Sequence, residues 1–247
     1  MSQSVDRAMR LLELLAREPA RLGAAAAHLG VHKSTALRLL QTLEAGGFAR
    51  RRDDGWTVGL RLVGLAQQAL DSLDVRAVAR PHLAALGRDC GHTIHLAQLV
   101  DDDLVYVDKI EARGQVRMYS QIGRTAPLHA SGVGKVVLAY CPEPRLTGLL
   151  DRTELRAYTP ATIRDPAALR AELAAVAGRG WAADDGEFES LITCVAAPVR
   201  HADGAVTAAV SVTAPTVVAT LADLHRLLPR LLATTQSISR DLGWSAP

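Results

Sequence analysis

Apolar residues recur at helical spacing along residues 1–60. A helix is predicted to begin with a cap at Ser4 and to end before Pro19, because proline cannot continue a helix. Its apolar face, spaced by three or four positions, consists of Val5, Ala8, Leu12 and Leu15. A short helix over residues 24–29 and a longer helix over residues 33–45 follow, each closed by glycine. This succession is typical of a helix-turn-helix.

Two short β-prone segments come next. Residues 48–50 and 56–58 flank Asp53-Asp54-Gly55, and an Asp-Gly turn in that position indicates a β-hairpin. A helix-turn-helix followed by a hairpin is a winged helix. We expect it to span residues 1–60.

Residues 60–73 form a helical stretch with more apolar surface than a free linker helix should carry. Another helix is predicted to run on to Gly91, with Pro81 in or near its first turns. A second copy of the same chain is the economical partner for the apolar stretch, so we expect a homodimer. Packing of the stretch on the chain's own C-terminal region stays open.

Strands and helices are interspersed over residues 91–247. Two hairpins are predicted, over residues 94–110 and 191–213, with turns at 101–103 and 203–204. Helices are predicted over residues 131–140, 143–150, 166–179 and, as one long final helix, 218–242. Antiparallel hairpins with interspersed helices predict an α+β domain around one central antiparallel sheet.

Composition narrows the class of protein. The chain has 247 residues, enough for two domains, and 49% are hydrophobic. No apolar run reaches 18 residues, and charges interrupt the first apolar stretch, which argues against a membrane span and a secretory signal. Three widely spaced cysteines indicate neither a zinc knuckle nor a disulfide scaffold. We therefore expect a cytoplasmic protein with no membrane partner.

Positive charge is concentrated in the winged helix. Residues 1–60 hold nine basic and six acidic residues, a net charge of +3, which leaves 19 basic and 20 acidic residues for the remainder. A basic domain favours an anionic partner, and an aromatic content of 4% argues against a stacking platform for single strands. The sequence therefore favours duplex DNA, although a winged helix that binds protein stays open.

The longer helix of the helix-turn-helix carries polar residues that suit DNA. Its first N–H groups and the hydroxyls of Ser34 and Thr35 suit phosphate oxygens, while Arg38 and Gln41 suit base edges in a major groove. Three consecutive arginines of the hairpin place charge beside the DNA backbone. The predicted DNA-binding residues are Lys33, Ser34, Thr35, Leu37, Arg38, Gln41, Arg50, Arg51 and Arg52.

Residues 91–247 contain no recognisable catalytic constellation. Residues 132–135 lack the first glycine and the hydroxyl of a phosphate loop, and no nucleophile elbow is present. A metal site of His95, His129 and Cys194 stays open, as does an enzyme that acts on a small acid through Cys194 or His129. No base is identifiable beside either residue, so we expect a protein that is not an enzyme and uses no cofactor.

A binding site is better indicated. Residues 131–134 precede or begin a helix, so their N–H groups are available to a carboxylate. Ser211 and Thr213 lie two apart in a strand, which places both hydroxyls on one side.

The chain resembles the IclR family of bacterial transcription regulators over nearly its whole length. The matching stretches, in order, are SVDRAMRLLELL, LGVHKSTALRLLQTLEAGGF, HLAQLVDDDLVYVDKI, GRTAPLHASGVGKVVLA, GWAADDGEFESLITCVAAPV and AAVSVTAP. The resemblance implies a winged helix-turn-helix over residues 1–60, a linker helix and connection over 61–90, and a GAF-like effector-binding domain over 91–247. It also implies a dimer or dimer of dimers, and DNA binding that small carboxylic or aromatic acids modulate.

The resemblance further implies an effector pocket. Its residues are Met118, Gly132, Val133, Asp184, Cys194, Ser211 and Thr213, with Met118 in the apolar wall. Leu37, which can contact a thymine methyl, and His32 depart from residues common in relatives, so the operator sequence is not predicted. An acidic side chain disfavours a highly charged anion unless it is neutralised or hydrogen-bonded. A monocarboxylate with a further hydroxyl or keto group suits this lining better. The chain is therefore predicted to be a ligand-responsive repressor of a near-palindromic duplex operator.

Overall fold

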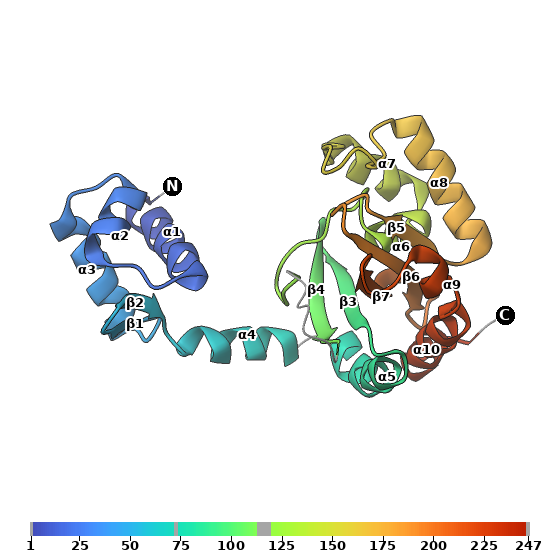
Figure 1. The fold of residues 1–247 in the computed structure, drawn as a ribbon, viewed down its shortest axis with the longest axis horizontal. Helices are drawn as coiled ribbons and strands as arrows, with labels where there is room; N and C mark the ends of the chain where they lie inside the picture. Colours follow the sequence, from blue (N-terminus) through green and yellow to red (C-terminus); the bar gives the residue numbers. More distant parts are fainter. Residues whose placement is uncertain (1, 72–73, 113–119, 246–247) are drawn as a thin grey trace. The chain divides into compact units, whose positions relative to one another are not determined.

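The computed structural model describes residues 2–71, 74–112 and 120–245, and the chain divides into two compact units at residues 72–73 (Figure 1). This boundary falls inside the predicted 61–90 connection. The first unit contains α1 (Gln3–Arg17), α2 (Leu22–Leu29), α3 (Lys33–Ala45), β1 (Ala49–Arg52), β2 (Gly55–Val58) and α4 (Arg61–Asp71). The second unit contains α5 (Asp74–Cys90), β3 (Thr93–Val100), β4 (Asp103–Ile110), α6 (Gly132–Ala139), α7 (Glu143–Arg152), α8 (Pro166–Arg179), β5 (Ala182–Asp185), β6 (Ile192–Arg200), β7 (Val206–Pro215), α9 (Leu221–His225) and α10 (Leu228–Asp241).

The first three helices and the hairpin enclose one hydrophobic core, to which Leu11, Leu15, Leu40 and Trp56 contribute buried side chains. Trp56 also ties the hairpin to the segment before α2, because its backbone exchanges hydrogen bonds of 2.8 and 2.9 Å with Ala20. The arrangement confirms the predicted winged helix.

Helix α1 differs from the prediction in its start and in its buried face. The N-cap is Ser2, whose side chain makes no capping hydrogen bond, so the predicted cap at Ser4 is wrong. The buried residues of α1 are Leu11 and Leu15, whereas Val5 is 56% exposed. At about 100° per residue, the predicted face is turned by roughly 60° from the face that packs on the core. The apolar stripe of α1 is therefore wider than the part of the helix that packs on the core.

Helix α4 is anchored to the first unit at its start. Arg61 donates a hydrogen bond from Nη1 to the carbonyl of Gly46 at 3.3 Å, and its guanidinium lies 5.3 Å from the centre of the Phe48 ring. Beside this anchor, Leu60 and Val63 are 69% and 64% exposed. The single chain therefore leaves an apolar surface around the start of α4.

The second unit is built on a five-stranded antiparallel sheet with the order β4-β3-β7-β6-β5. Both predicted hairpins are confirmed as neighbouring strand pairs, and the sheet confirms the predicted α+β class. Helix α6 packs on one face with α8 against it, while α5 and α10, which contact each other, pack on the other face (Figure 1). Since strand residues alternate between faces, Ile94 lies near Gly87 of α5, and His95 points to the face of α6.

Three parts of the second unit differ from the prediction. Strand β5 was not expected, because its Ala-Ala-Asp-Asp sequence has low strand propensity and its place depends on pairing with β6. The predicted final helix is two helices, since Thr220 and Asp223 form a capping box that begins α9, and Pro229 lies in the first turn of α10. Pro81 lies in the middle of α5 and not in its first turns, so it cannot donate to the carbonyl of Ala77. Within the described ranges, no helix is long and apolar enough to cross a membrane.

Candidate functional site

Helix α3 presents a polar face at the surface of the first unit. Lys33, Ser34, Arg38 and Gln41 are exposed, and Thr35 is half-buried. The residue before the helix caps it, because His32 Nδ1 accepts from the Ser34 N–H at 3.4 Å and lies 2.9 Å from the Ser34 hydroxyl.

Leu37 stands apart from the other predicted DNA-binding residues. Its side chain is half-buried and packs against the core of the first unit. Only part of it is available to a base.

The wing adds further positive charge to the first unit. Arg50, Arg51 and Arg52 are all exposed, on a strand whose register with β2 pairs Arg51 with Trp56. Among the residues that the structure describes, none pairs its carboxylate with these three arginines, with Lys33 or with Arg38. The cations of α3 and the wing are therefore available to an anionic partner.

The second unit contains a cavity of about 210 Å³ between the sheet and the start of α6. Strand register brings its residues together: His95 lies opposite Ser211, Thr213 lies opposite Cys194, and Cys194 lies opposite Asp184. The predicted effector residues that line this cavity are Gly132, Val133, Asp184, Cys194, Ser211 and Thr213. Met118 lies outside the described residues.

One end of the cavity is a neutral hydrogen-bonding cluster around His95. Its Nδ1 lies 3.2 Å from Thr213 Oγ1 and 3.4 Å from Ser211 Oγ, and its Nε2 lies 2.6 Å from Ser120 Oγ. Burial, aided by the charge of Lys109, lowers the pKa of His95 to about 3, so the ring stays neutral at physiological pH. A neutral imidazole offers one donor and one acceptor, which suits a hydroxyl or a carbonyl.

From the sequence, His95 is a candidate only as a metal ligand. The signal that makes it a binding residue is the pairing of β3 with β7. Local patterns do not contain that pairing.

The start of α6 approaches the sheet closely because it carries glycine. A Cβ on Gly132 would lie 2.7 Å from Cys194 Sγ, and one on Gly134 would collide with the carbonyl of Leu128. The Ser131 hydroxyl accepts from the Gly134 N–H at 3.1 Å. The first turn of the helix is thereby held at the cavity wall, which places the positive end of the helix dipole beside the cavity.

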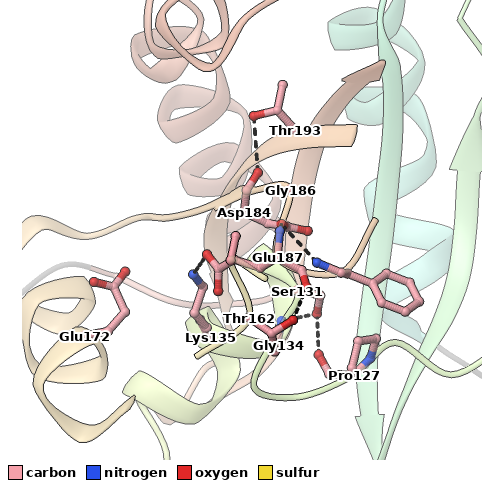
Figure 2. A network of polar contacts seen from close by, with 12 residues as sticks. Pro127, Ser131, Gly134, Lys135, Thr162, Glu172, Asp184, Gly186, Glu187 and Thr193 are labelled. Carbon is pink, nitrogen blue, oxygen red and sulfur yellow. Dashed lines mark hydrogen bonds and ion pairs between the residues drawn. The ribbon is translucent and has the colours of Figure 1, made fainter. Parts of the chain in front are cut away.

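Asp184 belongs to a buried polar network, shown in Figure 2. Its Oδ1 accepts from the backbone N–H groups of Glu187 at 2.7 Å and Phe188 at 3.4 Å. The Thr193 hydroxyl donates to its carbonyl at 3.2 Å. Beside it, the ammonium of Lys135, only 2% exposed, pairs with the Glu187 carboxylate. The network fixes the loop between β5 and β6, which carries Phe188 into the cavity wall.

Burial dominates the protonation of the acidic groups in this network. Burial, with a smaller contribution from the Glu187 carboxylate, raises the pKa of Asp184 to about 7, although the Glu187 N–H and the Lys135 charge oppose the rise. Burial likewise raises the pKa of the Cys194 thiol, and Asp184 adds to that rise. Cys194 is therefore a neutral thiol and not an activated nucleophile.

The structure separates the residues of the metal hypothesis. His95 and Cys194 line the cavity, but His129 binds the Arg156 carbonyl through Nε2 at 3.0 Å and does not line it. No three His, Cys, Asp or Glu side chains are grouped to hold a metal ion anywhere in residues 2–71, 74–112 and 120–245.

A winged helix with a basic exposed face, in one chain with an α+β unit that holds a cavity with polar groups in its wall, defines a ligand-responsive transcriptional regulator. The family of this regulator follows from comparison with known proteins. Residues 4–53 match the IclR helix-turn-helix domain, and residues 67–240 match the C-terminal domain of bacterial transcriptional regulator IclR. The chain belongs to the IclR family.

Individual relatives agree with this assignment. The chain is 34% identical over 248 residues to the HTH-type transcriptional regulator XynR of Escherichia coli K12, covering 99% of this chain and 98% of that protein. It is 33% identical over 219 residues to the transcriptional repressor IclR of the same organism, covering 86% and 80%. An IclR homologue of Microbacterium hydrocarbonoxydans, solved with 4-hydroxybenzoate, is 28% identical with a TM-score of 0.80, covering 97% and 98%. These relatives are regulators, and the chain is a regulator and not an enzyme.

Proposed function

We propose that the chain represses transcription by binding a near-palindromic duplex operator, and that a small hydroxy, keto or aromatic monocarboxylic acid bound in the second unit changes this affinity. The presence in one chain of a basic winged helix and of a cavity with polar groups in its wall carries the proposal. The functional parts are then the winged helix over residues 1–60, the connection over 61–90 and the effector domain over 91–247. Such a protein acts in the cytoplasm, where bacterial DNA lies.

Contacts with DNA divide into two kinds. We assign Lys33, Ser34, the half-buried Thr35 and the wing arginines to phosphate, because their side chains offer donors that suit sequence-independent contacts. Arg38 and Gln41, further along the exposed face of α3, are assigned to base edges. Leu37 has the smallest role, because it packs on the core.

A dimer follows from the apolar surface at the start of α4. Leu60, Val63 and Leu65 are exposed in the single chain, and a second copy that covers them places two winged helices in one molecule. The half-sites of the operator should then be separated by about 34 Å or a multiple of it. Val63→Glu should shift the protein toward monomers in size-exclusion chromatography with light scattering. Val217→Glu is the matched control, since Val217 is 83% exposed in the second unit.

The dimensions and polarity of the cavity support the effector class. A cavity of about 150 Å³ accommodates benzene, so about 210 Å³ suits one ring with small substituents. His95, Ser211 and Thr213 suit a hydroxyl or keto group at one end. The start of α6 suits a carboxylate. The bound 4-hydroxybenzoate of the Microbacterium homologue has the same combination of groups.

The DNA assignment is tested on an operator selected from random duplexes with the full-length protein. Arg38→Ala should abolish preference for that operator, whereas Arg51→Ala should weaken binding to all sequences and reduce the salt slope by about one. Arg17→Ala, an exposed arginine of α1, is the control for lost charge. Unchanged operator preference in Arg38→Ala would contradict the assignment.

The effector assignment is tested by thermal shift with a panel of hydroxy, keto and aromatic acids. A ligand at a hundred times its Kd stabilises by about 2.7 kcal/mol, which raises the Tm of a chain of this size by roughly 5–10 °C. Ser211→Ala should reduce that shift, and Ser237→Ala on α10 should not. A shift that survives Ser211→Ala would place the ligand elsewhere.

A further inference from the structure

Asp184 presents a problem for the proposed function, on which the following inference rests. Its carboxyl is buried on the wall of a cavity of about 210 Å³ that is to receive another carboxylate. Two charged carboxylates in so small a space repel strongly. One of them must be neutralised by a cation or by a proton.

The cation beside Asp184 is already engaged. The positive charge of Lys135 on α6 favours the charged form of Asp184, but the Lys135 ammonium pairs with the Glu187 carboxylate. The negative charge of Glu187 disfavours the charged form of Asp184. The hydrogen bonds from the Glu187 and Phe188 N–H groups are both accepted by Oδ1. The second oxygen, Oδ2, is therefore the one left for a ligand.

The remaining groups around the cavity do not supply a proton near neutral pH. His95 of β3 is already neutral, and burial raises the pKa values of Tyr106 of β4 and Cys194 of β6, which keep their protons. The hydroxyls of β7 do not titrate in this range. The other charged side chains on the wall are Arg124, in the segment before α6, and Glu189, in the loop after β5. Both are exposed to solvent, which screens their charges.

We propose that Asp184 meets the effector as a neutral acid and donates a hydrogen bond from Oδ2 to its carboxylate, so that a proton from solvent is bound together with the effector. Asp184 thereby selects a singly charged acid, because its proton neutralises its own carboxylate and leaves the effector with the one remaining negative charge. The ion pair with Glu187 holds the Lys135 ammonium away from Asp184.

The proposal has a pH signature. Since the pKa of Asp184 in the free protein is about 7, the proton must be taken up from solvent above that pH. The Kd should then rise roughly 16-fold between pH 7 and 8.5, with a slope that approaches tenfold for each pH unit at the upper end of that range. Between about pH 5 and 6 the Kd should change little, because Asp184 is already protonated and the effector carboxylate is still mostly ionised.

The state of Asp184 is measured first, without a ligand, in the full-length protein. The 13C shift of its carboxyl, assigned with Asp184→Asn, should titrate near pH 7. A carboxyl that stays ionised down to pH 5 would overturn the proposal.

Proton uptake is measured next by calorimetry with 4-hydroxybenzoate in phosphate and Tris buffers at pH 8. The dependence of the observed heat on buffer should correspond to nearly one proton taken up. Asp184→Asn should bind with a Kd that no longer changes between pH 7 and 8.5, because the amide still accepts at Oδ1 and donates without titrating. Glu189→Gln, which removes an exposed carboxylate from the same wall, is the matched control and should keep the pH slope.

Each result has one reading. Binding without proton uptake, or an unchanged pH slope in Asp184→Asn, overturns the proposal and leaves the effector function intact. Absence of 4-hydroxybenzoate binding together with a carboxyl that titrates near pH 7 supports the neutral Asp184 and counts against that acid as the effector.

Discussion

Replacing Gly132 by alanine tests how closely α6 must approach the sheet. The added Cβ would lie 2.7 Å from Cys194 Sγ and 3.3 Å from Ala196 Cβ. Favourable contacts lie at about 3.5–4.0 Å, so the first of these is too short by about 1 Å. Overpacking of this kind costs about 1–3 kcal/mol, and we expect the Tm of the second unit to fall by about 2–12 °C.

The assay is chemical and thermal unfolding of the full-length protein. Gly178→Ala in α8 is the matched control, because a Cβ there meets nothing within 4 Å and alanine favours the helix. Cys194→Ala removes the sulfur that Gly132→Ala would touch. The double variant should therefore be more stable than the two single changes predict together, by at least about 0.5 kcal/mol. Additive effects, or a Gly132→Ala protein as stable as Gly178→Ala, would refute the close approach.

Three further changes follow from buried or capping contacts. Lys135→Met should destabilise the folded protein by about 3–5 kcal/mol, because it leaves the Glu187 carboxylate buried without its ion pair. Denaturant midpoints measure this loss, and a loss below about 1 kcal/mol would contradict the pairing. Asp184 binds its proton more tightly in the folded than in the unfolded chain, so the free energy of unfolding should fall as pH rises from about 4 to 7, by roughly 4 kcal/mol at most. Asp184→Asn, unfolded over the same pH range, should show a smaller fall. Thr220→Ala should cost about 0.5–2 kcal/mol by removing the cap of α9. Thr234→Ala, at a half-buried threonine inside α10 that caps no helix, should not reproduce this effect.

Local patterns predict much of the first unit. The Asp-Gly turn sets the hairpin, and the glycines after α2 and α3 end those helices. The burial of Leu11 in place of Val5 depends instead on how α1 docks on the other helices. Periodicity finds an apolar stripe, but the width of the stripe that is covered depends on tertiary packing.

The site divides in the same way. Gly132 and the hydroxyls of Ser211 and Thr213 are found from local spacing, while Asp184 and Cys194 are found only through resemblance to a family. His95 is missed as a binding residue, because its role depends on a strand pairing across more than a hundred positions. The Lys135 ion pair is missed as well, since its partner lies 52 residues away and no local signal connects the two.

The row of cavity residues across the sheet has a consequence for the order in which the chain assembles. His95 and Thr213 are separated by 118 positions, so closing β3 on β7 carries the loop-closure entropy of most of the second unit. Pairings of such high contact order form slowly, because the entropy of loop closure is lost before the contacts offset it. A molecule bound in the cavity, against both strands, therefore stabilises a pairing that local structure supports least. Amide hydrogen exchange in β7 should slow more on effector binding than exchange in α8, which depends on near neighbours in the sequence.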